Sequence, residues 1–459
     1  MSNSSAGPYE SFSFLSGGSA PLYLVTFDKS GVCQSPLTLA RLLDEVKKGL
    51  YTDIHVFSHG WNNVFKDALQ RYREFFSNYF RLRDQRNLND PKLYRPVVVG
   101  VIWPSSWFVM PWESTPKIAA VSSAPERDEA ESANRELLTE VSAEIQSSDR
   151  QRFFALAERT DALSPNEARE LAAILLPIYQ HSALSAEGAE IVDPSVPEVT
   201  ADHLLALWTK MAPGNGSTAQ EPGFAKGNEP AGFQAAANPF SWLDPRGPIR
   251  IASVLVMKDR AGTVGYNGVG PLLVQKLLEQ NSSRVHLVGH SFGCKVMLSS
   301  LCCQRPANPA ASLLLLQPAV SYLCFGEAID QKGRRGGYRS AMEYVRKPIL
   351  STFSNRDIPL TKLFHLAVIR DSDWGEMKIA GVPPSKFAAL GGFGPGGLED
   401  GESTTVTMPA VAQKYPAADG TLKVIGVDGS DGKIKGHGDV ATDFTAWAHL
   451  NLVSGEQLS

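Results

Sequence analysis

The residues best placed to do chemistry form the pentapeptide Gly289-His-Ser-Phe-Gly293, with Ser291 at its centre. A buried strand is expected before it, because Val285 to Val288 are continuously apolar. A helix is expected after it, since apolar residues recur with a helical period over 294–302. So sharp a turn leaves no room for side chains two positions from the serine, and both positions are glycine. Such a turn exposes the hydroxyl and directs the amides of the helix N-terminus toward any negative charge formed beside it.

Strand, Gly-x-Ser-x-Gly and helix together are the context of a nucleophile elbow. On these residues the chain resembles the α/β-hydrolase superfamily, in particular its serine esterases and lipases. The resemblance covers about 50–105 and 250–452. It implies a mostly parallel central sheet with helices on both faces, and it makes Ser291 the catalytic nucleophile. Three further features should follow: a base with its acid, an oxyanion hole and a substrate-selecting region.

The base must be a histidine, because a serine hydroxyl is a weak nucleophile until a neutral imidazole takes its proton. In the resembled family the chain order is serine, acid, histidine. His437 follows the last expected strand in a Gly-flanked loop and resembles the family's catalytic histidine. His365 is the second candidate, and His449 is expected to lie packed or exposed within a helix.

The acid fixes the tautomer of the base and stabilises its protonated form. Asp357 is preferred because it ends an expected strand and resembles the family's post-strand aspartate. The alternative interpretation is a turn or helix-capping aspartate. Glu327 or Asp330 is the other choice, since some lipases place the acid after the preceding strand. Asp371 and Asp373 fit less well because neither directly ends an expected strand.

An oxyanion hole needs two amide N–H groups close to the developing alkoxide. The first is expected from Phe292, the residue after the serine. The second is expected from Trp61, because His59-Gly60-Trp61 resembles the lipase His-Gly-x motif. A plain strand-to-helix turn is the alternative. His55 and His59 are ordinary alternating strand residues, so we expect no metal site there, and no cofactor elsewhere.

Tryptophans gather after the strand expected over 95–103, at the edge where parallel-sheet enzymes place their sites. With Trp61, they are candidates for the walls of an apolar acyl pocket, or for a seal between two parts of the chain. The tryptophans at and after the end of that strand are Trp103, Trp107 and Trp112. The identity of the substrate cannot be read from these residues.

Continuously apolar strands that alternate with helices predict a parallel sheet covered on both faces. Strands are expected at 21–27, within 53–62 where the strand ends in a turn, and at 95–103, 285–288, 312–317, 347–357 and 422–427, with an edge strand at 402–408. Helices are expected at 36–50, 64–83, 266–280 and 442–452, whereas 249–257 fits a strand or a buried helix.

The chain is expected to have one core built from 21–105 and 249–455. The Ser- and Gly-rich residues 1–20 are expected to be poorly ordered. Residues 106–248 show helical composition and end in a Gly/Pro-rich tract, so we interpret them as a helical insertion. The insertion precedes the elbow, whereas many relatives carry their cap after the following strand. It is a lid, a cap or a peripheral appendage.

Charge and cysteine content exclude several classes of protein. The 44 Lys and Arg residues nearly balance 48 Asp and Glu, which argues against a nucleic-acid partner. No Sec signal and no apolar run of 18 residues are present, so we expect no integral membrane association. The odd number of five cysteines, mostly in apolar segments, is typical of reduced thiols and indicates a cytoplasmic location.

The sequence therefore predicts a serine hydrolase that cleaves a carboxylic ester or thioester through an acyl-enzyme, with a small-molecule or lipid-like acyl substrate. Peptide substrates are less favoured, because nothing in the chain indicates an extended peptide groove. Two alternatives stay open. The same apparatus can transfer the acyl group to an alcohol or amine, and a hydrolase fold can serve as a non-catalytic binding protein. The oligomeric state is not predicted.

Overall fold

The computed structural model describes residues 6–60, 65–105, 135, 138–159, 162–184, 200–211, 245–280, 282–329, 333, 335–363, 388–416 and 420–454. Its centre is a sheet whose nine strands lie in the order β1-β2-β4-β3-β5-β6-β7-β9-β8. Their bounds are Glu10–Ser13 (β1), Ser19–Thr26 (β2), Asp53–Ser58 (β3), Pro96–Ile102 (β4), Arg284–His290 (β5), Ser312–Leu316 (β6), Ile349–Phe353 (β7), Ser403–Thr407 (β8) and Val424–Asp428 (β9).

Every pairing in this sheet is parallel except that of β1 with β2. Strands β3, β4, β6 and β7 are buried along their whole length, which explains their mainly apolar sequences. Polar residues within them, such as Asp53 and His55 of β3, are buried as well. Parallel strands bring their carboxyl ends to one edge, so the residues after β3, β4, β5, β6 and β7 meet there. The mostly parallel α/β class predicted from the sequence is confirmed.

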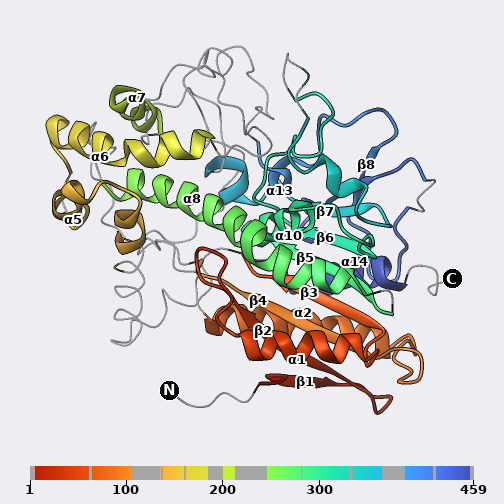
Figure 1. Cartoon of the computed structure of the whole chain (residues 1–459). Coiled ribbons are helices and arrows are strands. Elements are labelled where there is room, and N and C mark those ends of the chain that lie inside the picture. The colour runs from red at the N-terminus through yellow and green to blue at the C-terminus, as the bar shows by residue number, and fades with distance from the viewer. Residues whose placement is uncertain are drawn as a thin grey trace, which may run out of the picture.

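Helices cover both faces of the sheet (Figure 1). One face carries α1 (Pro36–Lys47), α8 (Arg246–Thr263), the π-helix η3 (Val264–Val274), α9 (Gln275–Leu278) and α10 (Phe292–Cys302). The other carries α2 (Phe65–Asp84) and α14 (Asp443–Ser454). Shorter elements follow β6 and β7, namely η4 (Arg339–Met342), η5 (Pro359–Leu363) and α13 (Leu390–Phe393).

Helix α10 is more deeply buried than its sequence pattern predicts. The pattern at 294–302 suggests one apolar side, but every residue from Phe292 to Leu301 is buried. The helix lies between the sheet and α8 with η3, so it is covered from two directions. Its neighbours approach closely because η3 is rich in glycine: a Cβ on Gly265 would lie 2.5 Å from the carbonyl oxygen of Val296. The glycines at 265, 268 and 270 therefore allow close packing.

The N-terminal segment differs from its prediction. The sequence indicates a poorly ordered segment over 1–20, whereas the structure places β1 as an antiparallel edge strand on β2. Phenylalanines of this segment reach the core, since the ring centroid of Phe14 lies 4.8 Å from that of Phe80 on α2. Arg73 of α2 also pairs with Glu10 at 2.6 Å. These contacts join residues far apart in the chain, and a local composition of serine and glycine does not reveal them.

The boundary predicted at 248/249 also differs, because a single helix crosses it. The ambiguous segment 249–257 lies inside α8, which continues through η3 into α9. The described helices of 106–248 are α5 (Arg150–Ala157), α6 (Pro165–Leu184) and α7 (Ala201–Met211), with the 3-10 turn η1 (Ser147–Asp149) before them. Helix α6 packs against both α7 and α8.

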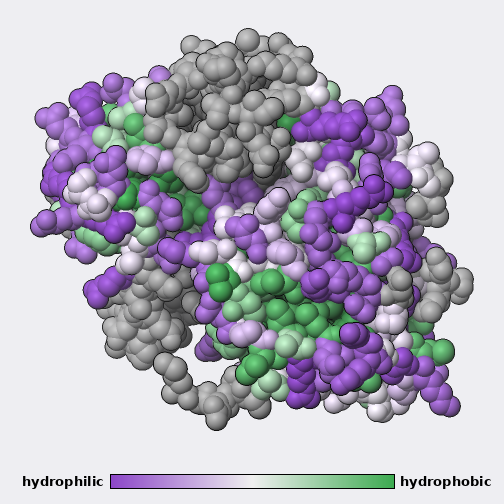
Figure 2. Space-filling model, viewed as in Figure 1, coloured by the Kyte–Doolittle hydropathy of each residue, from purple (hydrophilic) through white to green (hydrophobic). Residues whose placement is uncertain are grey.

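Exposed apolar side chains occur on the face covered by α1 and η3. They are Val32, Leu37, Tyr266 and Leu272. Figure 2 shows a hydrophobic area over this part of the surface, surrounded by hydrophilic residues.

Candidate active site

The candidate nucleophile lies at a strained turn between β5 and α10. Ser291 has φ 55° and ψ −124°, a backbone conformation that L-residues rarely adopt. A Cβ on Gly289 would lie 2.6 Å from the Cα of Cys294, and one on Gly293 would lie 2.1 Å from the carbonyl oxygen of Ser58. Both glycines are therefore sterically required, for the reason that the sequence pattern suggests.

Ser291, His437 and Asp357 form one hydrogen-bonded chain. The Ser291 hydroxyl lies 2.8 Å from Nε2 of His437, and Nδ1 of His437 lies 2.7 Å from Oδ2 of Asp357. A carboxylate only accepts, so Nδ1 carries the proton and Nε2 accepts from the serine. Ser291 and Asp357 are buried, whereas the His437 side chain is 12 % exposed. The three residues come from the ends of β5, β7 and β9, which are brought together only by the sheet.

Two further donors hold Asp357. Its Oδ1 accepts the backbone N–H of Leu360 at 3.1 Å, and its Oδ2 accepts Nε2–H of Gln317 at 3.1 Å. The alternative acid Glu327 lies elsewhere, in ion pairs with Arg335 at 2.7 Å and with Arg339. The structure thus brings the aspartate after β7 to the histidine.

Several candidates fall outside the described residues: Trp61, Trp107, Trp112, Asp330, His365, Asp371 and Asp373. His449, by contrast, is described, and it lies buried against His55, with the two ring nitrogens 2.9 Å apart. It belongs to a different region of the sheet from Ser291.

His59 and Gly60 lie beside the nucleophile. Nδ1–H of His59 donates to the carbonyl oxygen of Gly60 at 2.8 Å, and Nε2 accepts the backbone N–H of Trp103 at 3.3 Å. Burial lowers the pKa of His59 to about 4, so the ring is neutral at pH 7. A Cβ on Gly60 would lie 2.6 Å from the Cβ of Ser291. The segment before Trp61 is therefore fixed directly against the serine.

Trp103 packs against His59. Its ring stacks on His59 with centroids 5.5 Å apart, and its indole N–H donates to the His59 carbonyl oxygen at 3.2 Å. The side chain is buried, so of the two interpretations for Trp103 the packing role fits its contacts. Phe292, the expected oxyanion donor, is the first residue of α10 and is also buried.

Sequence reasoning gave no role to three polar residues around the triad. His290 is the last residue of β5, Gln317 directly follows β6, and Arg71 lies on α2. Each donates to the loop that carries His437. The sequence could have indicated a role for His290 and Gln317, because polar residues at the carboxyl ends of parallel strands face the site. The sequence indicated no role for Arg71, since its contact joins residues 367 positions apart.

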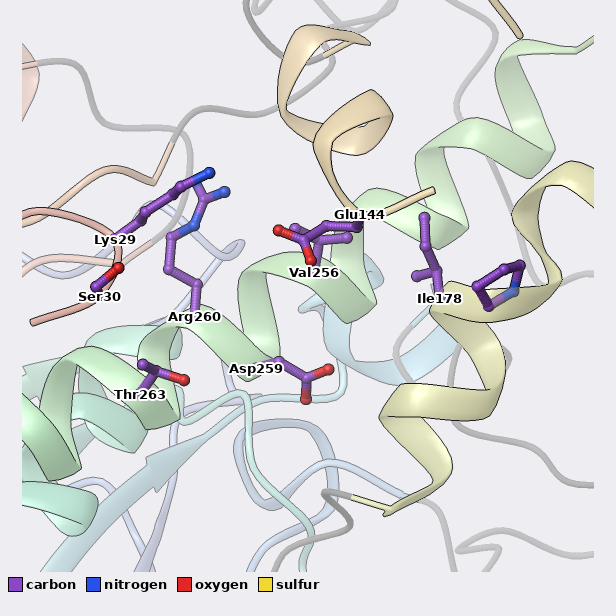
Figure 3. A pocket seen from close by; sticks show the side chains of 9 residues that line it. Lys29, Ser30, Glu144, Ile178, Val256, Asp259, Arg260 and Thr263 are labelled. Atoms are coloured by element: carbon purple, nitrogen blue, oxygen red, sulfur yellow. The ribbon is translucent and has the colours of Figure 1, made fainter. Parts of the chain in front are cut away.

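A separate cavity of about 350 Å³ lies between the loop after β2, α6 and α8. Figure 3 shows Lys29 and Ser30 on one side, Ile178 on the other, and Arg260 between them. Arg260 pairs with Glu140 and reaches the carbonyl oxygen of Pro104 at 3.4 Å. None of the described lining residues belongs to the triad.

Comparisons with protein-family models, with curated proteins and with solved structures found no match for this chain. Within the described part of the chain, no group of three or more His, Cys, Asp and Glu side chains is arranged to hold a metal ion. Among the same residues, every helix is too short or too polar to cross a membrane.

Proposed function

We propose that this protein is a serine hydrolase with an α/β-hydrolase fold that cleaves a carboxylic ester or thioester through an acyl-enzyme. The observation that carries the proposal is the hydrogen-bonded chain from Ser291 through His437 to Asp357, with the serine at a strained strand-to-helix turn. Such a turn costs free energy and persists where the surrounding structure requires it. Serine, imidazole and carboxylate in this order are the groups that nucleophilic acyl transfer needs.

The reaction starts when Oγ of Ser291 attacks the substrate carbonyl carbon while its proton passes to Nε2 of His437. The carbonyl π electrons move to oxygen, and the amides of Phe292 and Trp61 donate to that oxyanion in this proposal. The tetrahedral intermediate then collapses, the alkoxide or thiolate takes the proton from His437 and leaves, and the acyl group stays on Ser291. Asp357 remains ionised and stabilises the imidazolium.

Deacylation repeats these steps with water. His437 takes a proton from water, the hydroxide oxygen attacks the acyl carbon, and the Ser291 oxygen leaves with the proton of the imidazolium. The carboxylic acid is released and the resting site is restored. An alcohol or amine in place of water gives acyl transfer by the same route, so product analysis in the presence of added alcohol separates the two activities.

We propose that the helices of 106–248 form an insertion that selects substrates, and that this insertion keeps a fixed position against the sheet. Buried residues of α5, α6 and α7 join the same hydrophobic cluster as α8 and the sheet. Chain continuity supports a place near the site, since this region follows β4, and Trp103, directly after β4, lies beside His59.

The test is intact-protein mass spectrometry after treatment with a fluorophosphonate. We expect one adduct on the wild type and none on Ser291→Ala, because only a serine activated by a base displaces fluoride. Ser300→Ala is the matched control: this α10 serine donates to the Val296 carbonyl oxygen at 2.6 Å and should leave the adduct in place. Absence of an adduct on folded wild type would favour the binding-protein alternative.

Kinetics on a p-nitrophenyl ester give the second measurement. Ser291→Ala should lower kcat by about 10⁴-fold or more, as for other triad serines. Its melting temperature should stay near that of the wild type, since the substitution removes one oxygen and keeps the Cβ. An Ala variant that retains activity would contradict the assignment of the nucleophile.

A further inference from the structure

The loop that carries His437 is held only in part by its own turns, in which the N–H of Asp439 donates to Gly436 O at 3.2 Å and that of Val440 donates to Gly438 O at 2.9 Å. It lies between β9 and α14 and contains neither strand nor helix over 435–440. Glycines flank the histidine, and a Cβ on Gly436 or Gly438 would have no atom within 4 Å. Apolar packing fixes the ends of this segment, where Ile434 and Val440 are buried, but not positions 436 and 438 beside the histidine. Flexible residues lose about 1–2 kcal/mol of backbone entropy each when they are ordered, so other contacts must hold the base in place.

Those contacts are hydrogen bonds to three successive backbone carbonyls. Nε2–H of Gln317 donates to Gly436 O at 2.7 Å, and Nε2–H of His290 donates to His437 O at 2.9 Å. Nη1–H of Arg71 donates to Gly438 O at 3.4 Å. The three donors come from the end of β6, the end of β5 and helix α2, so they approach the loop from different elements.

Gln317 links the loop to the acid. The same Nε2 group that donates to Gly436 O also donates to Oδ2 of Asp357 at 3.1 Å. The residue is buried and has φ 45°, in the left-handed region that non-glycine residues seldom occupy. This backbone strain places the amide between the Asp357 carboxylate and the loop that carries His437.

His290 occupies the central position because it directly precedes Ser291. These two neighbouring residues contact His437 at its ring and at its backbone. Ser291 Oγ lies 2.8 Å from Nε2 of the ring, and His290 donates to the backbone carbonyl. A carbonyl only accepts, so His290 carries its proton on Nε2. Burial, with the charges of Arg71 and His437 nearby, keeps its pKa well below the ordinary value. The neutral ring therefore presents one donor to the loop.

We propose that His290, Gln317 and Arg71 are positioning residues that together hold the loop of His437, with His290 setting the distance between nucleophile and base. The inference rests on the proposed function only in its kinetic consequence. The geometric statement is independent: without the His290 donor, the imidazole of His437 leaves its place between Ser291 and Asp357. Because a displacement of 1 Å can cost about 10²-fold in rate, the effect is measurable.

The experiment compares three histidine variants at two positions of β5. His290→Leu removes the donor, and His290→Gln keeps an amide N–H at nearly the same reach. His286→Leu is the matched control, a buried histidine of the same strand that bonds Asp53 and Ser312 at 3.0 and 2.8 Å, away from the loop. We expect kcat on a p-nitrophenyl ester to fall about 10–100-fold in His290→Leu with little change in KM. His290→Gln should recover most of it, and His286→Leu should lower only the melting temperature.

Nuclear magnetic resonance of ¹⁵N-histidine-labelled protein gives a readout that needs no activity. The Nδ1 proton of His437, identified by its loss in Asp357→Ala, should be retained in His290→Gln and His286→Leu. It should shift or broaden in His290→Leu. Arg71→Met should have a smaller effect, since its contact is longer at 3.4 Å.

An unchanged His437 resonance and an unchanged kcat in folded His290→Leu would overturn the inference. Equal losses in His290→Leu and His290→Gln would also overturn it, because they would indicate packing instead of donation. If the wild type shows no hydrolysis and no fluorophosphonate adduct, the proposed function fails, while the resonance still decides whether His290 positions His437.

Discussion

At the scale of single residues, the site depends on very close packing around the nucleophile. Gly60 allows the segment after β3 to lie directly against Ser291, because a Cβ there would be 2.6 Å from the serine Cβ and 2.9 Å from Nδ1 of His290. Such distances leave no room for a methyl group. The glycine before Trp61 is thus required by the nucleophile and not by its own backbone conformation.

Gly60→Ala is expected to displace Ser291 and to lower kcat on a p-nitrophenyl ester by about 10²-fold, with a loss of stability of about 1–3 kcal/mol. Gly438→Ala is the control, since a Cβ there meets no atom within 4 Å. It should keep both kcat and melting temperature. Wild-type kcat in Gly60→Ala would show that the serine is not packed as closely as described.

Asp357→Asn tests the acid. Asp357 accepts on both oxygens, at Oδ2 from His437 and Gln317 and at Oδ1 from the Leu360 N–H, whereas an amide has one acceptor oxygen and one NH2 group that only donates. The imidazole then loses its required tautomer, and kcat should fall by about 10⁴-fold. Steady-state kinetics with circular dichroism as a folding check measure this. A loss below about tenfold would exclude Asp357 as the partner of the base.

At the scale of elements, the helices of 106–248 share one hydrophobic core with the sheet. Leu171 and Leu175 of α6 are fully buried in the cluster that also contains Met257 of α8 and Val25 of β2. Helix α6 of this region also packs against α8, which begins at Arg246 and continues through η3 into α9. We therefore expect the region and the sheet to unfold together.

Leu171→Ala should lower the free energy of unfolding by about 2–5 kcal/mol through loss of burial and the cavity left behind. Differential scanning calorimetry should show one transition that moves as a whole. Arg169→Ala is the control, because this α6 side chain is 61 % exposed and its pair with Asp202 contributes little. A second transition, with the main one unmoved, would identify α5–α7 as an independent appendage.

At the scale of the whole molecule, a second polar region lies near the starts of β3 and β5, away from the triad. His55 bonds Tyr94 and His449 at 2.9 Å each, and its ring stacks on His286 at 5.0 Å. The guanidinium of Arg83 covers the Tyr94 ring at 3.5 Å. Burial and the neighbouring histidines hold the pKa of His55 and His449 well below the ordinary value.

Stability should consequently fall in acid. The unfolded chain binds protons on these histidines as pH drops through about 6.5, whereas the folded protein keeps them neutral, so acid favours unfolding. One pH unit below that value, His55 and His449 should each lower the free energy of unfolding by about 1.4 kcal/mol. Urea unfolding from pH 7.5 to 5.5 measures the slope. His449→Leu should reduce this slope by the contribution of one histidine. An unchanged slope would contradict the buried neutral state of His449.

Local patterns in the sequence determined much of this protein. Runs rich in apolar residues identified the buried strands β3 to β7, because strands covered on both faces carry few polar side chains. The Gly-x-Ser-x-Gly pattern is visible within five residues, although the atoms that exclude a side chain at Gly293 belong to Ser58 and His59 of a distant segment. Ser291, Asp357 and His437 were selectable because the ends of parallel strands meet at one edge.

The tertiary structure alone decided what joins distant segments. The strand β1, the continuous α8 and the buried contact of His449 depend on surfaces that other parts of the chain supply. The roles of His290, Gln317 and Arg71 depend on a loop more than 100 residues away in sequence. Hydrogen bonds of this kind leave no periodicity, since each is satisfied by position in space and not by spacing along the chain.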